Sequence, residues 1–127
     1  MRRQNKALET VDFADLTARA WRSLLAAAAS RGSGTAPEWL VRHGDGYGPA
    51  ADAPEAMQPL LELYAPLCFA QAERPLTIAH LGQSLDGYIA TKSGDSYYVT
   101  GPDNVRHLHR LRALNSAIVV GNAAGAR

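Results

Sequence analysis

Two short polar stretches, 84–87 and 93–96, carry the residues of this chain that are best suited to hold a ligand. The apolar run 76–81 is typical of a buried strand and leads directly into the first of them. Gly, Ser and Asp at the end of such a strand present backbone amides and short polar side chains at a sheet edge, where ligands bind in open α/β folds. We therefore interpret this corner as the candidate binding site.

The residues around this corner predict the elements that position it. In chain order these are a strand at 75–82, a corner with a short strand at 83–91, a loop at 92–96, a strand at 97–99, a helix at 102–114 and a strand at 116–121. Thr100 and Asp103 form a potential capping box, and Pro102 suits the first helical turn. The run at 116–121 is continuously apolar, as in a parallel strand covered on both faces. A right-handed parallel crossover from 75–82 to 116–121 through the helix is expected.

The residue pattern in this half of the chain resembles the reductase domain of riboflavin biosynthesis, which is the C-terminal half of the bifunctional deaminase/reductase. The matching residues are Ser84-Leu85-Asp86-Gly87, Ile89-Ala90, Ser93-Gly94-Asp95-Ser96, Tyr98-Val99-Thr100-Gly101, His109-Arg110-Leu111-Arg112-Ala113 and Ala117-Ile118-Val119-Val120-Gly121. The resemblance implies a partial dihydrofolate-reductase-like α/β fold with a mostly parallel sheet and flanking helices. It also implies NADPH as cofactor and reduction of the ribosyl group of a 5-amino-6-(5-phosphoribosylamino)uracil-like pyrimidine.

The resemblance assigns roles to four residues of the reductase segment. Gly82 and Tyr98 fall at cofactor positions, and Ser96 and Arg112 fall at positions that contact the phosphorylated pyrimidine. Each residue also has a purely structural interpretation. Gly82 suits the bend that ends a strand, and Ser96 suits a turn. Tyr98 suits an ordinary strand, and Arg112 suits the C-terminal end of a helix.

No catalytic residue and no metal site are predicted. Asp86 is a candidate carboxylate, but an Asp-Gly pair at a corner favours turn chemistry. Tyr88 stands where the bifunctional enzymes commonly have Lys or Arg. The resemblance implies either that this chain has lost a cationic contact to the substrate or that its substrate is different, since related stand-alone reductases carry aromatic residues here. His107 and His109 are two residues apart on the expected helix and do not share a face, so they cannot form the usual metal pair.

The first half of the chain, residues 1–74, lies outside the resemblance and is expected to be a helical N-terminal extension of the reductase segment 75–127. Asp12 or Asp15 is a potential cap for a helix that ends near Ser30. The segment 44–54 is rich in Gly, Ala, Pro and Asp and is expected to be a connector, and 54–64 is expected to be a short helix. The apolar stripe of the first helix comprises Leu16, Ala20, Leu24 and Ala28, broadened by Trp21 and Leu25.

Composition excludes several classes of function. A net charge of +1 over 127 residues gives no electrostatic basis for binding nucleic acid or a membrane surface. Cys68 is the single cysteine, so an internal disulfide is excluded, and its apolar surroundings predict a buried, inert thiol. The basic N-terminus lacks the apolar segment of a signal peptide, so a cytoplasmic location is expected.

The last six residues, 122–127, depart from the family pattern, with Ala124 where a threonine is expected. This departure favours a truncated reductase, whose complete form would be a homodimer. The alternative is a non-catalytic remnant or interaction module that pairs with another chain through an open sheet edge.

Overall fold

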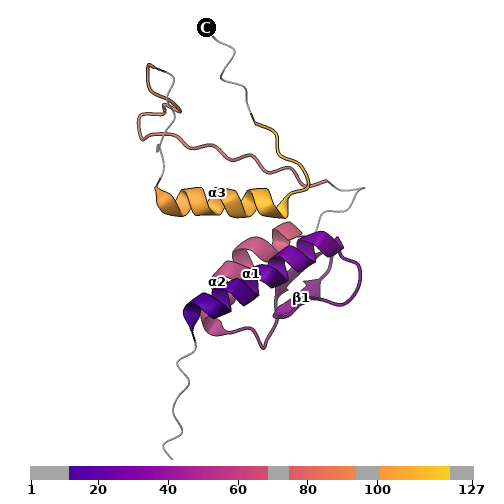
Figure 1. Ribbon diagram of the computed structural model, residues 1–127. Coiled ribbons are helices and arrows are strands. Elements are labelled where there is room, and N and C mark those ends of the chain that lie inside the picture. The colour runs from indigo at the N-terminus through magenta and orange to yellow at the C-terminus, as the bar shows by residue number, and fades with distance from the viewer. Residues whose placement is uncertain (1–11, 69–74, 94–100, 121–127) are drawn as a thin grey trace, which may run out of the picture. The chain divides into compact units, whose positions relative to one another are not determined.

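The computed structural model describes residues 12–68, 75–93 and 101–120 (Figure 1). The chain divides into two compact units, Met1–Gln71 and Ala72–Arg127, referred to below as unit 1 and unit 2. The described residues contain helices and a two-stranded antiparallel sheet. The expectation of a mixed α and β composition is therefore confirmed.

Unit 1 begins with helix α1, Phe13–Ser30, whose two ends follow from local chemistry. The carboxylate of Asp12 accepts a hydrogen bond of 2.9 Å from the amide of Ala14, which caps the first turn. Arg31, at a φ of 47°, ends the helix in a left-handed conformation, and Gly32 follows at a φ of 79°. The predicted start and stop of this helix are confirmed.

The buried face of α1 is narrower than the sequence stripe suggested. Ala20 and Leu24 are buried as expected, together with Ser23 and Ala27, whereas Leu25 is exposed. The small side chains at positions 20, 23 and 27 let neighbouring elements approach this side of the helix closely. The buried face is therefore centred on these positions, and Leu25 lies outside it. The inclusion of Leu25 in the buried stripe was wrong.

A β-hairpin follows α1, where the sequence predicted a connector. Strand β1, Leu40–His43, pairs antiparallel with strand β2, Gly46–Pro49, in a register that places His43 opposite Gly46. The two-residue turn therefore consists of Gly44 and Asp45, and Gly44 has a φ of 54°. Only a glycine adopts this backbone conformation without strain. The strands are short and not regularly amphipathic, so periodicity did not reveal them.

The rest of unit 1 packs α1 against a run of short helices. These are the 3-10 helix η1, Glu55–Met57, helix α2, Gln58–Tyr64, and the 3-10 helix η2, Ala65–Cys68. The predicted helix at 54–64 is thus found in two adjoining pieces. Met57, Leu61 and Tyr64 are buried, and the Tyr64 ring meets the Trp21 ring edge to face with centroids 5.9 Å apart.

Cys68 ends this core as a buried thiol. Its sulfur lies 3.4 Å from the carbonyl oxygen of Leu24 and 3.3 Å from that of Tyr64, so the thiol can donate to either. Burial raises the pKa of the Cys68 thiol from 9.0 to about 11. A thiol that stays protonated is a poor nucleophile, which agrees with the predicted inert role.

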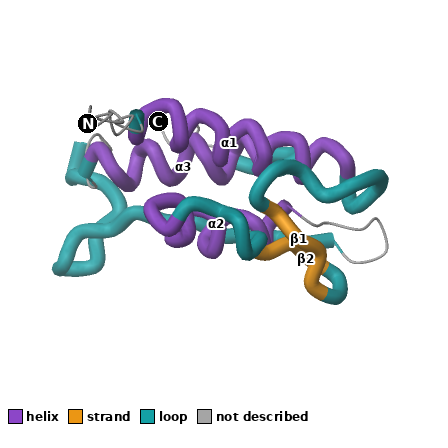
Figure 2. The backbone as a smooth tube through the Cα atoms, turned by 90° about the horizontal axis from the view of Figure 1, so that it is seen from below, coloured by secondary structure: helices purple, strands orange, loops and turns teal. Residues whose placement is uncertain are grey.

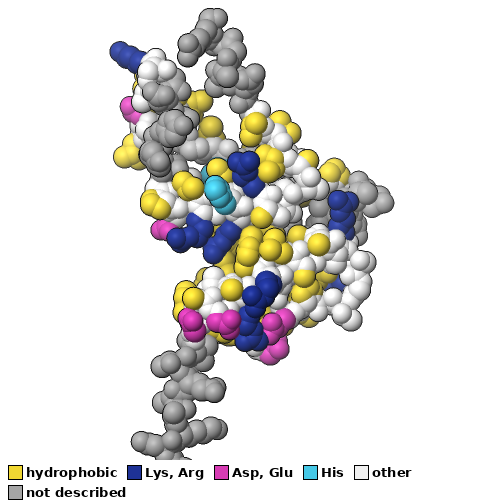
Figure 3. Space-filling view, viewed as in Figure 1, with side chains coloured by type: hydrophobic (Ala, Val, Ile, Leu, Met, Phe, Trp, Pro, Cys, Tyr) yellow, Lys and Arg dark blue, Asp and Glu magenta, His cyan; other side chains and the backbone are white. Residues whose placement is uncertain are grey.

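Trp39, just before β1, has a strained backbone conformation, and neighbouring side chains contact its ring. Its φ of 61° is uncommon for a bulky side chain, and the side chain is 8% exposed. The guanidinium of Arg19 lies 4.5 Å from the centre of the Trp39 ring and forms an ion pair with Glu38, which raises the pKa of Arg19. Figure 3 shows acidic and basic side chains intermixed along the α1 side of unit 1. We infer that stacking and the ion pair fix Trp39 against α1.

Helix α3, Pro102–Leu114, is the regular element of unit 2 and has the predicted bounds. Its N-cap is Gly101, which makes no side-chain capping bond, and Thr100 lies outside the described residues. The Asp103 carboxylate instead pairs with Arg106, 3.2 Å away. The expected capping box of Thr100 and Asp103 therefore stays a prediction.

The predicted parallel sheet is not observed. The segments 75–82 and 116–120 are irregular, and β1 and β2 are the only strands in the described part of the chain (Figure 2). Leu81, Val119 and Val120 are 69%, 97% and 74% exposed, respectively. A strand is stable only when neighbouring strands pair with it, and two strands alone are marginal. The predicted parallel pairing of 75–82 with 116–121 is therefore not found for residues 75–82 and 116–120, although both runs have strand-like composition, and Gly121 lies outside the described residues.

Candidate functional site

The corner at 84–88 closes on itself through backbone hydrogen bonds. The amide of Ser84 donates to the carbonyl of Tyr88 over 2.8 Å, and the amide of Gly87 donates to the carbonyl of Ser84 over 2.9 Å. Gly87 has a φ of 88°, a conformation that the missing Cβ permits. The expected tight polar corner is therefore present as a turn that needs no sheet to hold its shape.

The side chain of Ser84 holds Asp86 in this turn. The Ser84 hydroxyl contacts the Asp86 carboxylate and also lies 3.0 Å from the carbonyl oxygen of Tyr88. The carboxylate thus serves the turn, as the Asp-Gly pair predicted. Asp86 and Tyr88 remain exposed, so the carboxylate and the phenol both face solvent.

Gly82 precedes this corner by two residues and is half-buried in the irregular segment 75–82. Ser96 and Tyr98 lie in 94–100, outside the described residues. The roles of Gly82, Ser96 and Tyr98 stay predictions.

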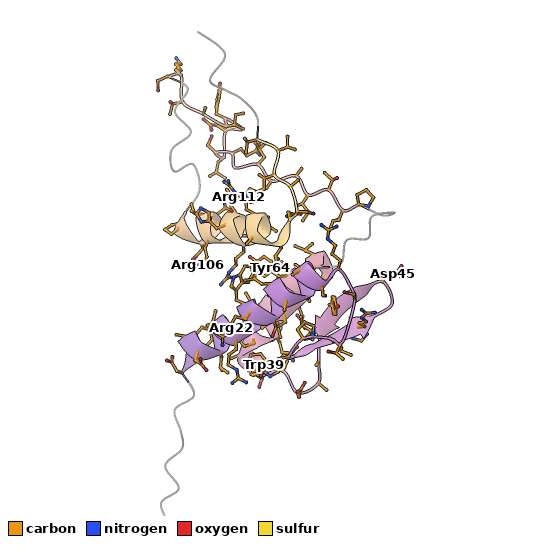
Figure 4. All side chains as sticks on the ribbon, turned by 45° about the vertical axis from the view of Figure 1, so that its right-hand side comes forward. Arg22, Trp39, Asp45, Tyr64, Arg106 and Arg112 are labelled. Atoms are coloured by element: carbon orange, nitrogen blue, oxygen red, sulfur yellow. The ribbon has the colours of Figure 1, made fainter. Side chains whose placement is uncertain are left out.

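Arg112 lies exposed in the last turn of α3. No hydrogen bond or ion pair engages its guanidinium within the described ranges. Arg106 lies six residues earlier, on a different side of α3, and is paired with Asp103 (Figure 4). The two arginines therefore differ in what they can offer to an anionic ligand, since a planar guanidinium fork binds phosphate best when it has no competing carboxylate.

Three polar side chains that the sequence analysis did not connect meet in unit 2. The imidazole Nε2 of His80 lies 3.5 Å from the amide nitrogen Nδ2 of Asn104. The rings of His80 and His107 have centroids 5.7 Å apart and are tilted by 53°. Asn104 and His107 are three residues apart on α3, so they share a helix face. No sequence signal joins His80 to this face, because 24 residues separate it from Asn104.

Two kinds of site are absent from the described ranges 12–68, 75–93 and 101–120. No group of three or more His, Cys, Asp and Glu side chains is placed there to hold a metal ion. No helix in these ranges combines the length and the apolar character needed to cross a bilayer.

Comparison with known proteins identifies the segment that holds the corner and α3. No curated protein and no solved structure matches the chain. One family model does match, that of the RibD C-terminal domain, and it covers residues 75–125, which is less than half of the chain. The match spans both polar stretches, Gly82 and Arg112, and it leaves the helices and hairpin of unit 1 outside. Residues 75–125 are thus similar to the RibD C-terminal domain, which agrees with the resemblance noted in the sequence analysis.

Proposed function

We propose that unit 2 is a reductase module of the riboflavin-biosynthesis type, which binds NADPH and reduces a phosphorylated ribosylamino-pyrimidine. The observation that carries this proposal is the family match over 75–125, which includes all four residues with predicted ligand roles: Gly82, Ser96, Tyr98 and Arg112. The substrate that fits the family is a 5-amino-6-(5-phosphoribosylamino)uracil-like pyrimidine.

The reaction is a hydride reduction at the sugar. The bond between C1′ and the ring oxygen breaks, C1′ gains a hydride, and the released oxygen gains a proton, which converts the ribosyl group to ribityl. NADPH, when bound, would supply the hydride. The residues of this chain would position the reactants: the backbone at Gly82 lets the cofactor approach closely, and Arg112 binds the substrate phosphate.

Weak cofactor binding is expected for the chain alone. The segments 75–82 and 116–120 are not held in a sheet, so part of the binding energy must order them first. Titration of the ¹⁵N-labelled chain with NADPH, followed by NMR, measures such weak binding and locates it. We expect shifted amides at 82–88 and unshifted amides in α1.

Two results would contradict this function. One is the absence of any shifted amide in 75–120 at millimolar NADPH. The other is a shift pattern confined to unit 1. A parallel titration with NADH tests cofactor choice, and oxidation of NADPH in the presence of the pyrimidine substrate tests the reaction itself.

A second candidate is an interaction module without catalysis, and the exposed strand-like segments favour it. Val119 and Val120 are β-branched and largely exposed, and they pair with no strand in the described part of the chain. Such segments are prone to pair with a strand of another chain. Sedimentation of the chain across a range of concentrations measures this tendency. For an interaction module, Val119→Lys should reduce association, and NADPH should shift no amide of unit 2.

A further inference from the structure

We propose that His80 and His107 form a binding site for a divalent transition-metal ion, with Asn104 as a third ligand and solvent in the remaining positions. The proposal does not depend on reductase activity. It rests on the meeting of three side chains from two segments of unit 2 that are far apart in sequence.

The distance between the two imidazole rings suits a shared ion. Zn²⁺ binds imidazole nitrogen at about 2.0–2.1 Å in tetrahedral geometry, which puts the centres of two coordinating rings roughly 5 Å apart. The His80 and His107 centroids are 5.7 Å apart, and their tilt of 53° keeps them from stacking face to face. The observed ring spacing is therefore close to that of two imidazoles that share one ion.

Asn104 offers an oxygen at the same place. Its amide group faces Nε2 of His80, and turning the amide over exchanges Nδ2 for Oδ1 at nearly the same position. The amide oxygen would then be the third ligand. Asn104 and His107 are three residues apart on α3, which is the spacing that lets two helix residues bind one ion.

The ligand set decides the class of metal. Two imidazole nitrogens with one amide oxygen suit Zn²⁺, Ni²⁺ and Cu²⁺, whereas Mg²⁺ prefers an all-oxygen set. No third His, Cys, Asp or Glu joins the pair among the described residues, so solvent completes the coordination and the ion stays exchangeable. The affinity is accordingly lower than that of a closed structural zinc site.

Such an ion would link the irregular segment 75–82 to α3. The described residues show no strand in unit 2, so the ion would tie together parts that no sheet joins. Because metal binding free energy adds to folding free energy, the ion would stabilise this unit.

The chain contains four histidines, which makes a matched experiment possible: His43, His80, His107 and His109. The untagged full-length chain is titrated with ZnCl₂ and with NiCl₂ by calorimetry, with MgCl₂ as a negative control. We expect one ion per chain. His80→Ala and His107→Ala should each weaken binding by more than about 10-fold, since even outer-shell changes cost 10- to 100-fold. His43→Ala and His109→Ala should leave the affinity unchanged within about 2-fold, because His43 lies in unit 1 and His109 does not share the helix face of His107.

A second measurement separates loss of a ligand from loss of structure. Thermal unfolding without metal should be the same for wild type and His80→Ala, because the His80 side chain is exposed. Added Zn²⁺ should raise the melting temperature of the wild type and not that of the variant. The proposal is overturned if the wild type binds neither metal at millimolar concentration, or if His43→Ala or His109→Ala weakens binding as much as His80→Ala does.

Discussion

Arg106 and Arg112 are residues of one type on one helix that differ in their charged partners. Both lie on α3, but the guanidinium of Arg106 is paired with Asp103 and that of Arg112 is exposed without a carboxylate partner among the described residues. The family match and the exposure of its side chain make Arg112 the better candidate for contact with a phosphate.

Substituting Arg112 should therefore weaken binding of the phosphorylated pyrimidine. Loss of a charge-assisted hydrogen bond costs about 1.5–3 kcal/mol, which is a rise of roughly 10- to 150-fold in the dissociation constant. Arg112→Ala is compared with Arg106→Ala by NMR titration of the full chain, and the Arg106 variant should lose much less. If Arg112→Ala lowers the melting temperature but leaves the affinity intact, Arg112 only complements the helix dipole.

Cys68 predicts a dependence of stability on high pH. Burial raises the pKa of its thiol to about 11 in the folded chain, whereas the ordinary value is 9.0. Between these two values the unfolded chain has lost the proton and the folded chain retains it, so stability falls as pH rises from about 9 to 11. The loss is roughly 2–3 kcal/mol at most. It is measured by denaturant unfolding at several pH values, with Cys68→Ala as the control in which this contribution disappears.

The helices of this chain could be predicted at the scale of single elements, and the hairpin could not. The Asp12 cap, the Arg31-Gly32 stop and Pro102 are local signals, and α1 and α3 have the expected bounds. The hairpin of β1 and β2 has one glycine at its turn and few inward side chains, so neither composition nor alternation identified it. The prediction of strands in unit 2 met the opposite difficulty. The runs 75–82 and 116–120 have the composition of strands, but no neighbouring strand pairs with them in the described part of the chain.

Gly44 should be the residue on which the hairpin most depends. Its φ of 54° is unfavourable for any residue with a Cβ, although nothing lies within 4 Å of the site where a Cβ would be built. Gly44→Ala should therefore destabilise unit 1 by about 1–2 kcal/mol through backbone strain alone. Gly46→Ala is the matched control, since its Cβ would meet only the His43 carbonyl oxygen at 3.9 Å and its φ is ordinary. Equal losses in the two variants, measured by denaturant unfolding, would contradict this account.

The candidate site could be predicted from sequence only in part. The corner at 84–88 was recognised because Ser, Asp and Gly within five residues make a turn by local hydrogen bonds. The contact of His80 with Asn104 and His107 was not recognised, because it depends on how a segment packs against α3. The spacing of His107 and His109 argued against a metal site formed by these two residues. It gave no information about His80, which comes from a different segment of the chain.

At the scale of the whole molecule, the two units differ in how completely they bury their apolar side chains. Unit 1 has a core in which Leu24, Met57, Leu61 and Tyr64 are at most 2% exposed. In unit 2, Leu111 is the buried apolar residue of α3, and both strand-like runs retain exposed Leu, Ile and Val side chains. Burial of apolar surface is the main source of stability, so the two units should differ in local stability.

Hydrogen exchange should reveal this difference directly. Amides in the middle of α1 are expected to be strongly protected, because the helix is hydrogen-bonded and packed on one face. No backbone hydrogen bond joins 75–82 to 116–120 in the described residues, so amides in both runs should exchange within the shortest labelling time. Strong protection of 75–82 would show that these residues form a paired strand in solution, and it would restore the predicted parallel sheet.

The positions of the tryptophans make tryptophan fluorescence a specific probe of unit 1. Both tryptophans of the sequence, Trp21 and Trp39, lie in unit 1, one with its ring edge-to-face to Tyr64 and the other under Arg19. The emission of Trp39 should be blue-shifted and resistant to collisional quenchers, because its ring is shielded from water. Selective excitation of tryptophan therefore reports the melting of the helical and hairpin core. The sequence of unit 2 contains no tryptophan, so a change confined to unit 2 should leave this tryptophan signal unchanged.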